Sequence, residues 1–196
     1  MFKVIIADDE KIVRIAMRNI IDWESHGFNI VGLAQDGSEV LNILNENGAD
    51  LIITDLKMKG LNGIELIDKL KEENFRGKIL VLSNHGEYEL VREAMKKGAD
   101  DYLLKITLRP KELEDIIDKF RESLEERKEE EEKEAQFKNE FDKTKKLAEI
   151  SLLKEYLKDD LSYEELLNEF PKINFLDDNC EYYTGACIYI GTSIIF

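Results

Sequence analysis

Short apolar runs alternate with amphipathic segments along the first half of the chain. Runs of four to six residues, rich in branched apolar side chains and bounded by turn-like or helical stretches, are typical of buried strands in a parallel sheet. We therefore predict five strands, at residues 3–8, 29–34, 51–55, 79–83 and 102–105.

The segments between these runs predict helices. The first covers residues 11–25, where Ile12, Ala16, Ile20 and Trp23 have near-helical spacing. Strands that alternate with helices through right-handed crossovers form an α/β fold, a doubly wound parallel sheet with helices on both faces. The remaining helices are expected at 38–46, 63–72, 87–97 and from Pro110 onward.

A longer helical pattern follows Pro110. Residues 125–134 are mostly Glu, so this part is either a solvated helix or a disordered stretch. We expect a first domain over residues 1–120, an extended helical or coiled-coil linker over 110–157, and an incomplete second domain over 158–196. The residues with the 4-3-4 spacing of a coiled-coil seam are Leu113, Ile117, Phe120 and Leu124.

The segment after residue 157 predicts a partial α/β second domain. Ser162 and Glu165 form a capping-box pattern that opens a short helix, and Pro171 closes it. The last apolar stretch predicts one or two strands. Because a lone strand or hairpin is unstable, these strands need further chain or a second copy as partners.

Composition narrows the functional classes. The net charge is −15, and most of the excess acid lies after residue 110, so these residues should repel nucleic acid. No run of 18 apolar residues is present, which predicts no membrane span. Cys180 and Cys187 are too few for a disulfide framework, and we expect reduced thiols and a cytoplasmic location.

The predicted strands end on residues suited to phosphate chemistry. Asp8 and Asp9 end the first, Asp55 the third, Ser83 the fourth and Lys105 the fifth. Ligands of open parallel sheets bind outside the carboxyl ends of the strands, so these side chains should converge. Crowded carboxylates repel one another unless a cation joins them. The sequence therefore predicts a site for Mg²⁺ and a phosphoryl group.

Three segments that follow one another in order resemble the receiver domain of bacterial two-component response regulators. They are IIADDE, TDLKMKGLNGIEL and VLSNHGEYELVREAMKKGADDYLLK, and the resemblance covers about residues 1–120. It implies a flavodoxin-like sheet with strand order 2-1-3-4-5. The segment DWESHGFNIVGLAQDG is similar to receivers of long regulators with a helical linker and an AraC-family DNA-binding domain. That DNA-binding helix pair has no counterpart within these 196 residues.

The resemblance also implies the chemistry of the acidic site. Asp55 is the expected phosphoacceptor. Mg²⁺ is the expected cofactor, held by Asp9 and Asp55, by the backbone carbonyl of Lys57, and by Asp8 mainly through water. Hard oxygen ligands of this kind suit Mg²⁺, and phosphoryl transfer depends on positioning and charge neutralisation.

The residues that respond to the phosphoryl group follow from the same resemblance. Ser83 bonds the group, Lys105 neutralises it, and Tyr102 turns inward upon activation. The chain departs from the family pattern at Lys59 and Ile106, where Pro is usual, and at Asn84, where a small residue is common. We hypothesise that Asn84 crowds the site, while Lys57 and His85 flank it and tune the lifetime of the phosphate.

The implied function is a phosphorylation-dependent switch rather than an enzyme. A sensor histidine kinase would donate phosphate to Asp55, and the face of the fourth helix, fifth strand and fifth helix would respond. That face leads into the linker, so a homodimer through both is the expected output, with transcription regulation in the full-length protein. DNA would be contacted only through a missing C-terminal domain.

Two alternatives stay open. One is a phosphatase of the haloacid dehalogenase type, but its Asp-x-Asp motif lacks the second acid here because Leu56 and Lys57 follow Asp55. The other is a structural adaptor with the same fold and no phosphorylation.

Overall fold

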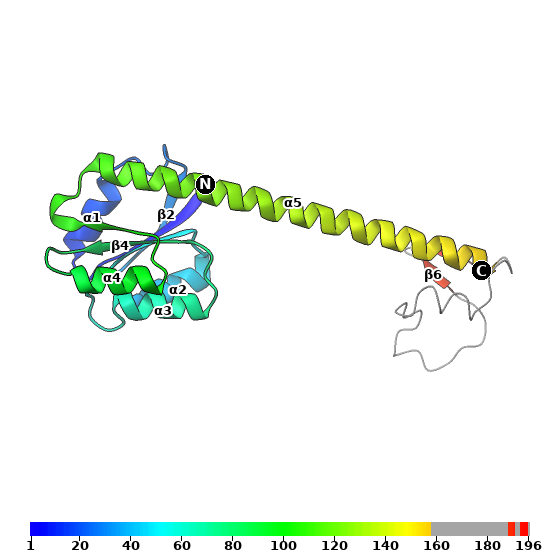
Figure 1. The fold of residues 1–196 in the computed structure, drawn as a ribbon, viewed down its shortest axis with the longest axis horizontal. Coiled ribbons are helices and arrows are strands. Elements are labelled where there is room, and N and C mark those ends of the chain that lie inside the picture. The colour runs from blue at the N-terminus through cyan, green and yellow to red at the C-terminus, as the bar shows by residue number, and fades with distance from the viewer. Residues whose placement is uncertain (158–187, 191–192, 196) are drawn as a thin grey trace. The chain divides into compact units, whose positions relative to one another are not determined.

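The first five strands form one parallel sheet in the order β2-β1-β3-β4-β5 (Figure 1). The computed structural model describes residues 1–157, 188–190 and 193–195. The strand order confirms the predicted flavodoxin-like fold class. The strands are β1 (Phe2–Ala7), β2 (Phe28–Ala34), β3 (Leu51–Asp55), β4 (Lys78–Ser83) and β5 (Asp101–Leu104).

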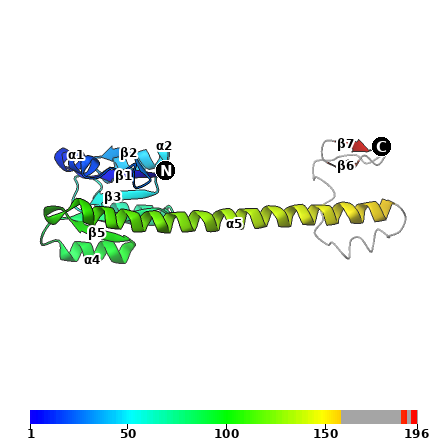
Figure 2. The same ribbon diagram turned by 90° about the horizontal axis from the view of Figure 1, so that it is seen from above.

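Helices cover both faces of this sheet. Helices α1 and α5 lie on one face and α2, α3 and α4 on the other, as the two perpendicular views show (Figures 1 and 2). A short 3₁₀ turn, Lys105–Thr107, follows β5. The helices are α1 (Lys11–Asn19), α2 (Gly37–Asn47), α3 (Gly63–Glu72), α4 (Tyr88–Lys97) and α5 (Pro110–Leu157).

Alternation along the strands divides the interior into two cores. Val4 and Ile6 of β1 belong to the core beneath α1 and α5, whereas Ile5 and Ala7 belong to the core beneath α2, α3 and α4. Successive side chains of a strand point to opposite faces, and here both faces are covered. This explains why the strands read as continuous apolar runs in the sequence.

Helix α1 is shorter than predicted, and its buried face differs. It ends at Asn19 rather than at residue 25. Trp23 turns back, and its Nε1 donates a hydrogen bond of 3.2 Å to the carbonyl of Met17, one of the carbonyls that a helix end leaves without a partner. Met17 is the buried residue of the helix, while Ile12 is 71% exposed. The wider 11–25 prediction was therefore wrong, although Trp23 itself is buried.

The apolar stripe at the start of α5 is part of the domain's own core. Its four residues are at most 7% exposed and pack with residues of β1, β3 and β4. They are therefore not available as a seam between two chains, which corrects the coiled-coil interpretation of this part. The residues are Leu113, Ile117, Phe120 and Leu124.

The Glu-rich residues 125–134 are helical, which decides between the two alternatives left by the sequence. A polar contact also fastens the start of α5. Nδ1 of His26, in the turn before β2, lies 2.9 Å from Oδ1 of Asp118. The helix is thus held to the domain by apolar packing on one side and by this pair near the β1–β2 edge.

The chain divides into two compact units, Met1–Lys133 and Glu134–Phe196. The second contains the end of α5 and an antiparallel pair, β6 (Ile188–Ile190) and β7 (Ser193–Ile195). The pair agrees with the predicted terminal strands. The capping box at Ser162 and the two cysteines lie outside the described residues, and the three-part domain plan stays a prediction. Within the described part of the chain, no helix is long and apolar enough to cross a membrane.

Burial on α5 and exposure on α1 give a direct test of this packing. Replacing the fully buried side chain in Ile117→Ala should lower the free energy of unfolding by about 2–5 kcal/mol, the usual cost of such a truncation in a core. The matched variant Ile12→Ala should change it by less than about 0.5 kcal/mol, because that side chain is in solvent. Urea denaturation measures both, and equal effects of the two variants would contradict the assigned cores.

Candidate functional site

The parallel register of the strands brings the predicted site residues to one edge of the sheet. Ala7 pairs with Thr54, and Asp55 pairs with Leu82, so Asp8, Asp55 and Ser83 all follow at the same level. Asp8, Asp55 and Ser83 are almost completely buried. The backbone hydrogen bonds of the sheet therefore set the positions of these residues, independently of contacts between their side chains.

The ammonium group of Lys105 lies between two of the carboxylates. Its Nζ is 2.6 Å from Oδ2 of Asp8 and 3.0 Å from Oδ2 of Asp55. The two carboxylates are buried, and Lys105 is only 11% exposed. Two buried anions near each other are unfavourable without such a cation, because desolvation penalises each charge. Lys105 is thus the counter-ion of the site as it stands.

The surroundings shift the pKa values of two of these groups. Burial raises the pKa of Asp55 above its ordinary value, and Asp8 adds to this. Lys105 and a hydrogen bond from the backbone N–H of Lys57 act in the opposite direction without outweighing burial. Burial alone would lower the pKa of Lys105, but its contacts with Asp8 and Asp55 prevail and raise it. Lys105 therefore stays charged near neutral pH.

Three buried oxygen atoms of the site have no hydrogen-bond partner within the described part of the chain. They are Oδ2 of Asp8, which lies in the ion pair with Lys105, and Oδ1 of Asp55 and Oγ of Ser83. Buried polar atoms are nearly always satisfied, and exceptions need an explanation such as a ligand. A carboxylate oxygen and a hydroxyl that are both free suit a group that accepts from Ser83 and is attached to Asp55.

Beside Asp55 and Ser83 lies a group of carboxylates that could hold a cation. Oxygen atoms of Asp8, Asp9 and Glu10 lie within 4.8 Å of one another. Asp8 is buried, Asp9 and Glu10 are exposed, and the backbone N–H of Glu10 donates to Oδ1 of Asp8. Carboxylates are the ligands that Mg²⁺ prefers. Glu10 was missed in the sequence analysis, although it directly follows Asp9 in the IIADDE segment.

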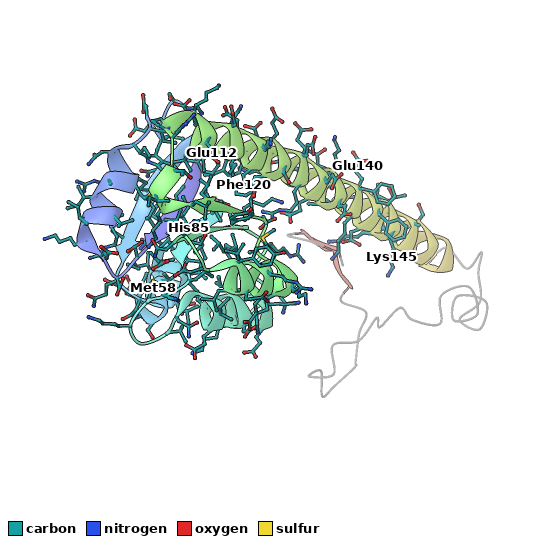
Figure 3. All side chains as sticks on the ribbon, turned by 60° about the vertical axis from the view of Figure 1, so that its left-hand side comes forward. Met58, His85, Glu112, Phe120, Glu140 and Lys145 are labelled. Carbon is teal, nitrogen blue, oxygen red and sulfur yellow. The ribbon has the colours of Figure 1, made fainter. Side chains whose placement is uncertain are left out.

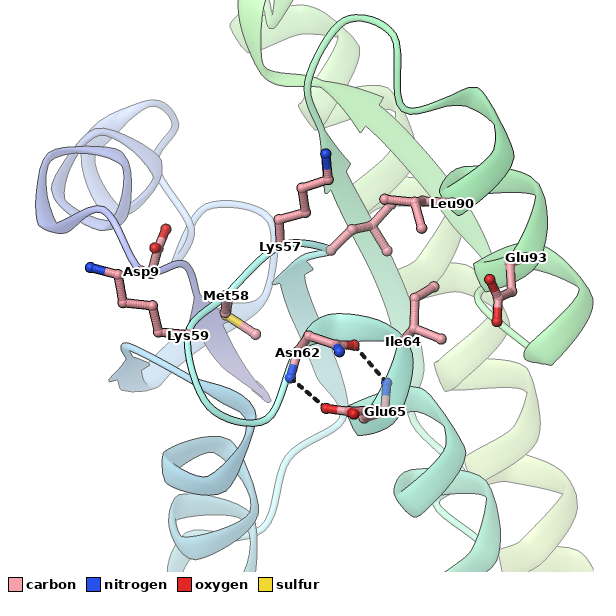
Figure 4. A pocket seen from close by; sticks show the side chains of 10 residues that line it. Asp9, Lys57, Met58, Lys59, Asn62, Ile64, Glu65, Leu90 and Glu93 are labelled. Carbon is pink, nitrogen blue, oxygen red and sulfur yellow. Dashed lines mark hydrogen bonds between the residues drawn. The ribbon is translucent and has the colours of Figure 1, made fainter.

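The loop after Asp55 is held tightly at its far end. A Cβ atom at Gly63 would lie 2.1 Å from the carbonyl oxygen of Asp55, so the first residue of α3 must be glycine for the two segments to approach this closely. Asn62 caps the helix: its side chain accepts from the N–H of Glu65, whose carboxylate accepts from the N–H of Asn62 (Figure 4). Residues 56–61 are thereby anchored on both sides.

This loop borders a groove of about 600 Å³ between α3 and α4 (Figure 4). Asp9 and the two cations Lys57 and Lys59 line it together with the apolar side chains of Met58 and Leu90. The groove thus has the exposed carboxylate of Asp9 at one side and a partly apolar wall at the other. Nζ of Lys57 lies 3.3 Å from Oε1 of Glu87.

A second hollow, of about 700 Å³, lies on the other side of the loop after Ser83. Its lining includes Asn84, His85, Tyr88 and Tyr102. Asn84 and His85 are exposed, and Tyr102 is 45% exposed. His85 lies at the same end of the domain as Met58 of the neighbouring loop (Figure 3). These predicted tuning and switch residues thus line one hollow together with Ser83.

Comparisons with known proteins agree with this geometry. The family model described as "Response regulator receiver domain" matches residues 4–118. The transcriptional regulatory protein YesN of Bacillus subtilis is 43% identical over 105 residues, 54% of this chain and 28% of that protein. The transcriptional regulatory protein HptR of Staphylococcus aureus is 34% identical over 105 residues, 54% of this chain and 41% of that protein. The chain thus spans less than half the length of these relatives.

Solved structures are similar over the same region. The receiver domain of AraT, a response regulator from Geobacillus stearothermophilus, has 33% identity and a TM-score of 0.61, covering 65% of this chain and 98% of that one. A two-component transcriptional regulator AraC from Clostridium phytofermentans has 25% identity and a TM-score of 0.59, covering 64% and 97%. The likeness therefore concerns the sheet and its helices.

The raised pKa of Asp55 predicts a gain in stability when its charge is removed. Because burial favours the protonated form, the ionised carboxylate opposes folding at pH values above the folded pKa, and this cost fades as the pH falls toward the ordinary carboxyl range. In metal-free buffer at pH 7, Asp55→Asn should therefore raise the Tm by a few degrees, the shift that about 1 kcal/mol produces in a domain of this size.

The control for this prediction is Glu46→Gln, which removes an exposed carboxylate from α2. It should leave the Tm within about a degree of the wild type, as surface changes usually do. Calorimetry at pH 7 and pH 4 makes the comparison. A lower Tm for Asp55→Asn at pH 7 would show that the Lys105 contact outweighs burial.

Proposed function

Because the chain belongs to the response regulator receiver domain family, we propose that Asp55 accepts a phosphoryl group from a sensor histidine kinase and that the modified domain regulates transcription in the full-length protein. The coarse assignment rests on the family match and on relatives that are transcriptional regulators. The single observation that carries the finer proposal is the buried Asp55 carboxylate. Its Oδ2 contacts Lys105, and its Oδ1 has no hydrogen-bond partner in the described part of the chain.

In the proposed transfer, Oδ1 of Asp55 attacks the phosphorus of a phosphohistidine. The new O–P bond forms as the P–N bond breaks, and the leaving imidazole nitrogen keeps the electron pair and takes up a proton. Lys105 remains charged and faces the oxygen atoms that gain negative charge. Phosphoryl transfer needs little more from a protein than this positioning and neutralisation.

The metal of the site is proposed to be Mg²⁺. Asp9, Asp55 and the backbone carbonyl of Lys57 would hold it, with Asp8 acting mainly through water, and the close grouping of the Asp8 and Asp9 carboxylates supports this choice. When bound, the ion supplies positive charge that offsets the carboxylates and the transferred group. Glu10 adds a further carboxylate at the exposed side of the same cluster.

The response to phosphorylation is proposed to begin at Ser83. Its buried hydroxyl has no partner within the described residues and would donate to the new phosphoryl oxygen atoms. Tyr102, half in solvent beside the second hollow, would then turn inward. Asn84 and His85 line the same hollow, and their role in tuning the lifetime of the phosphate stays a prediction. Receiver domains are in general signalling domains, which favours this switch over an enzyme.

Exposed apolar side chains near the site suit docking of the kinase. Ile12 and Ile15 lie on α1, which begins directly after the acidic cluster, and Ile106 follows Lys105. They are 71%, 37% and 76% exposed. Exposed apolar groups around a reactive centre are a feature of surfaces that bind a partner. We propose that the helix of the kinase that carries the phosphohistidine binds to the surface formed by Ile12, Ile15 and Ile106.

We propose that phosphorylation changes a homodimer. Its contact would include the face formed by α4, β5 and the start of α5, together with the later part of α5. Beyond the buried stripe, this helix carries exposed apolar residues, with Phe137 73%, Phe141 61% and Leu147 66% exposed. A helix in a protein gains most of its stability by packing an apolar face against other parts of the structure. These exposed residues therefore suit contact with a second copy of the chain. DNA contact is proposed only for a further domain, as the names of the relatives suggest.

Phosphorylation itself can be tested with a small phosphodonor. Incubation with acetyl phosphate and Mg²⁺ should add the mass of one phosphoryl group to the wild type. Asp55→Asn should gain none, and addition of EDTA should prevent the gain in the wild type. The matched control Asp115→Asn, on the exposed side of α5, should be modified like the wild type. Modification of Asp55→Asn to the same extent would place the acceptor elsewhere.

Coupling to the oligomeric state gives a second test. Beryllofluoride with Mg²⁺ mimics a bound phosphoryl group and should change the monomer–dimer balance in sedimentation experiments. Phe141→Ser should weaken the dimer, because it removes an exposed apolar side chain from the proposed contact, and Lys138→Ser in the neighbouring turn should have a smaller effect. Sedimentation that is identical with and without beryllofluoride would rule out this output.

A further inference from the structure

Glu87 is a buried carboxylate that the proposed chemistry does not use. Its side chain is only 7% exposed, and it directly precedes α4. An acidic residue at this position usually accepts hydrogen bonds from the first N–H groups of its own helix, but Glu87 makes no such bond. Its two oxygen atoms are directed elsewhere, so capping does not explain why it is buried.

Both oxygen atoms of Glu87 contact loops of the site. Oε2 accepts a hydrogen bond of 2.7 Å from the backbone N–H of Asn84, and Oε1 lies 3.3 Å from Nζ of Lys57. Asn84 directly follows Ser83. Lys57 lies two residues after Asp55, in the loop that follows β3. The Glu87 bridge, defined as these two contacts, therefore joins the loop of the acceptor to the loop of the hydroxyl.

The two contacts of the Glu87 bridge differ in strength, so one can hold the loop while the other is released. The bond from Asn84 is short and involves a charge, which makes it one of the stronger kinds of hydrogen bond. The ion pair is weaker, because Lys57 is 63% exposed and solvent screens it. Removing Lys57 alone would leave a buried carboxylate with less compensation, so the two contacts depend on each other.

We propose that Glu87 is a positioning residue that favours the resting arrangement of the two loops, an inference that rests on the proposed function of Asp55. A phosphoryl group on Asp55 is a new anion close to Lys57, and it competes with Glu87 for that ammonium. Movement of Ser83 toward the phosphoryl group displaces the next peptide, which Glu87 holds by its N–H. The bridge must therefore weaken for the switch to respond, and it sets the balance between the two states.

The test measures how tightly beryllofluoride binds in the presence of Mg²⁺. Glu87→Gln keeps an oxygen for Asn84 and removes the charge that faces Lys57, so it should tighten binding about threefold, the size of a partly exposed ion pair. Glu89→Gln removes an 81% exposed carboxylate from the first turn of the same helix and should leave binding unchanged.

A double-mutant cycle separates the bridge from a general effect of charge. If Glu87 acts through Lys57, Glu87→Gln should have little effect on the affinity in a Lys57→Met background. If its negative charge merely repels the bound anion, the same threefold gain should persist in that background. Persistence of the full gain, or equal affinities of wild type and Glu87→Gln, would overturn the proposal.

The amide resonance of Asn84 provides a readout that does not depend on phosphorylation. In the protein without beryllofluoride, its exchange with solvent should be slow, and Glu87→Ala should accelerate it while Glu89→Gln should not. Adding beryllofluoride to the wild type should also shift this resonance. If the wild type does not bind beryllofluoride, the proposed function of Asp55 fails. If it binds and the Asn84 amide is unaffected in Glu87→Ala, only the Glu87 bridge is wrong.

Discussion

The buried contact of Lys105 with Asp8 and Asp55 is the interaction on which the rest of the site depends. Two carboxylates at the ends of neighbouring strands would repel each other in an apolar interior, and the ammonium between them makes their burial tolerable. Among the residues that the structure describes, Oδ1 of Asp55 and the hydroxyl of Ser83 have no hydrogen-bond partner. The fold thus leaves buried oxygen atoms of the site available to a further group.

The fold connects this site to distant surfaces through short, well-packed segments. Gly63 brings the start of α3 against Asp55, and Glu87 ties the loop after Ser83 to Lys57. After Lys105 a single 3₁₀ turn leads into α5, whose first apolar stripe is buried in the core. These contacts connect Asp55 with α4 and α5, and we propose that a change in charge at Asp55 acts along them.

Much of this could be predicted from the sequence, because the information is local. Apolar runs gave the strands, and the right-handed crossover rule brought Asp8, Asp55, Ser83 and Lys105 to one edge. The end of α1 could not be predicted, because it depends on the hydrogen bond from Trp23 to Met17. The stripe of α5 has the same spacing whether it packs on its own sheet or on a second helix. The partners of Glu87 depend on side-chain directions across two loops, which no spacing reveals.

The most direct measurement is a crystal structure of the domain with Mg²⁺ and beryllofluoride. We expect the beryllium on Oδ1 of Asp55, the metal against Asp9 and Asp55, and Oγ of Ser83 within hydrogen-bond distance of a fluorine atom. We also expect Nζ of Lys105 to leave Asp8 and contact the fluoride group. A structure with beryllofluoride bound away from Asp55, or with Ser83 still lacking a partner, would contradict this expectation.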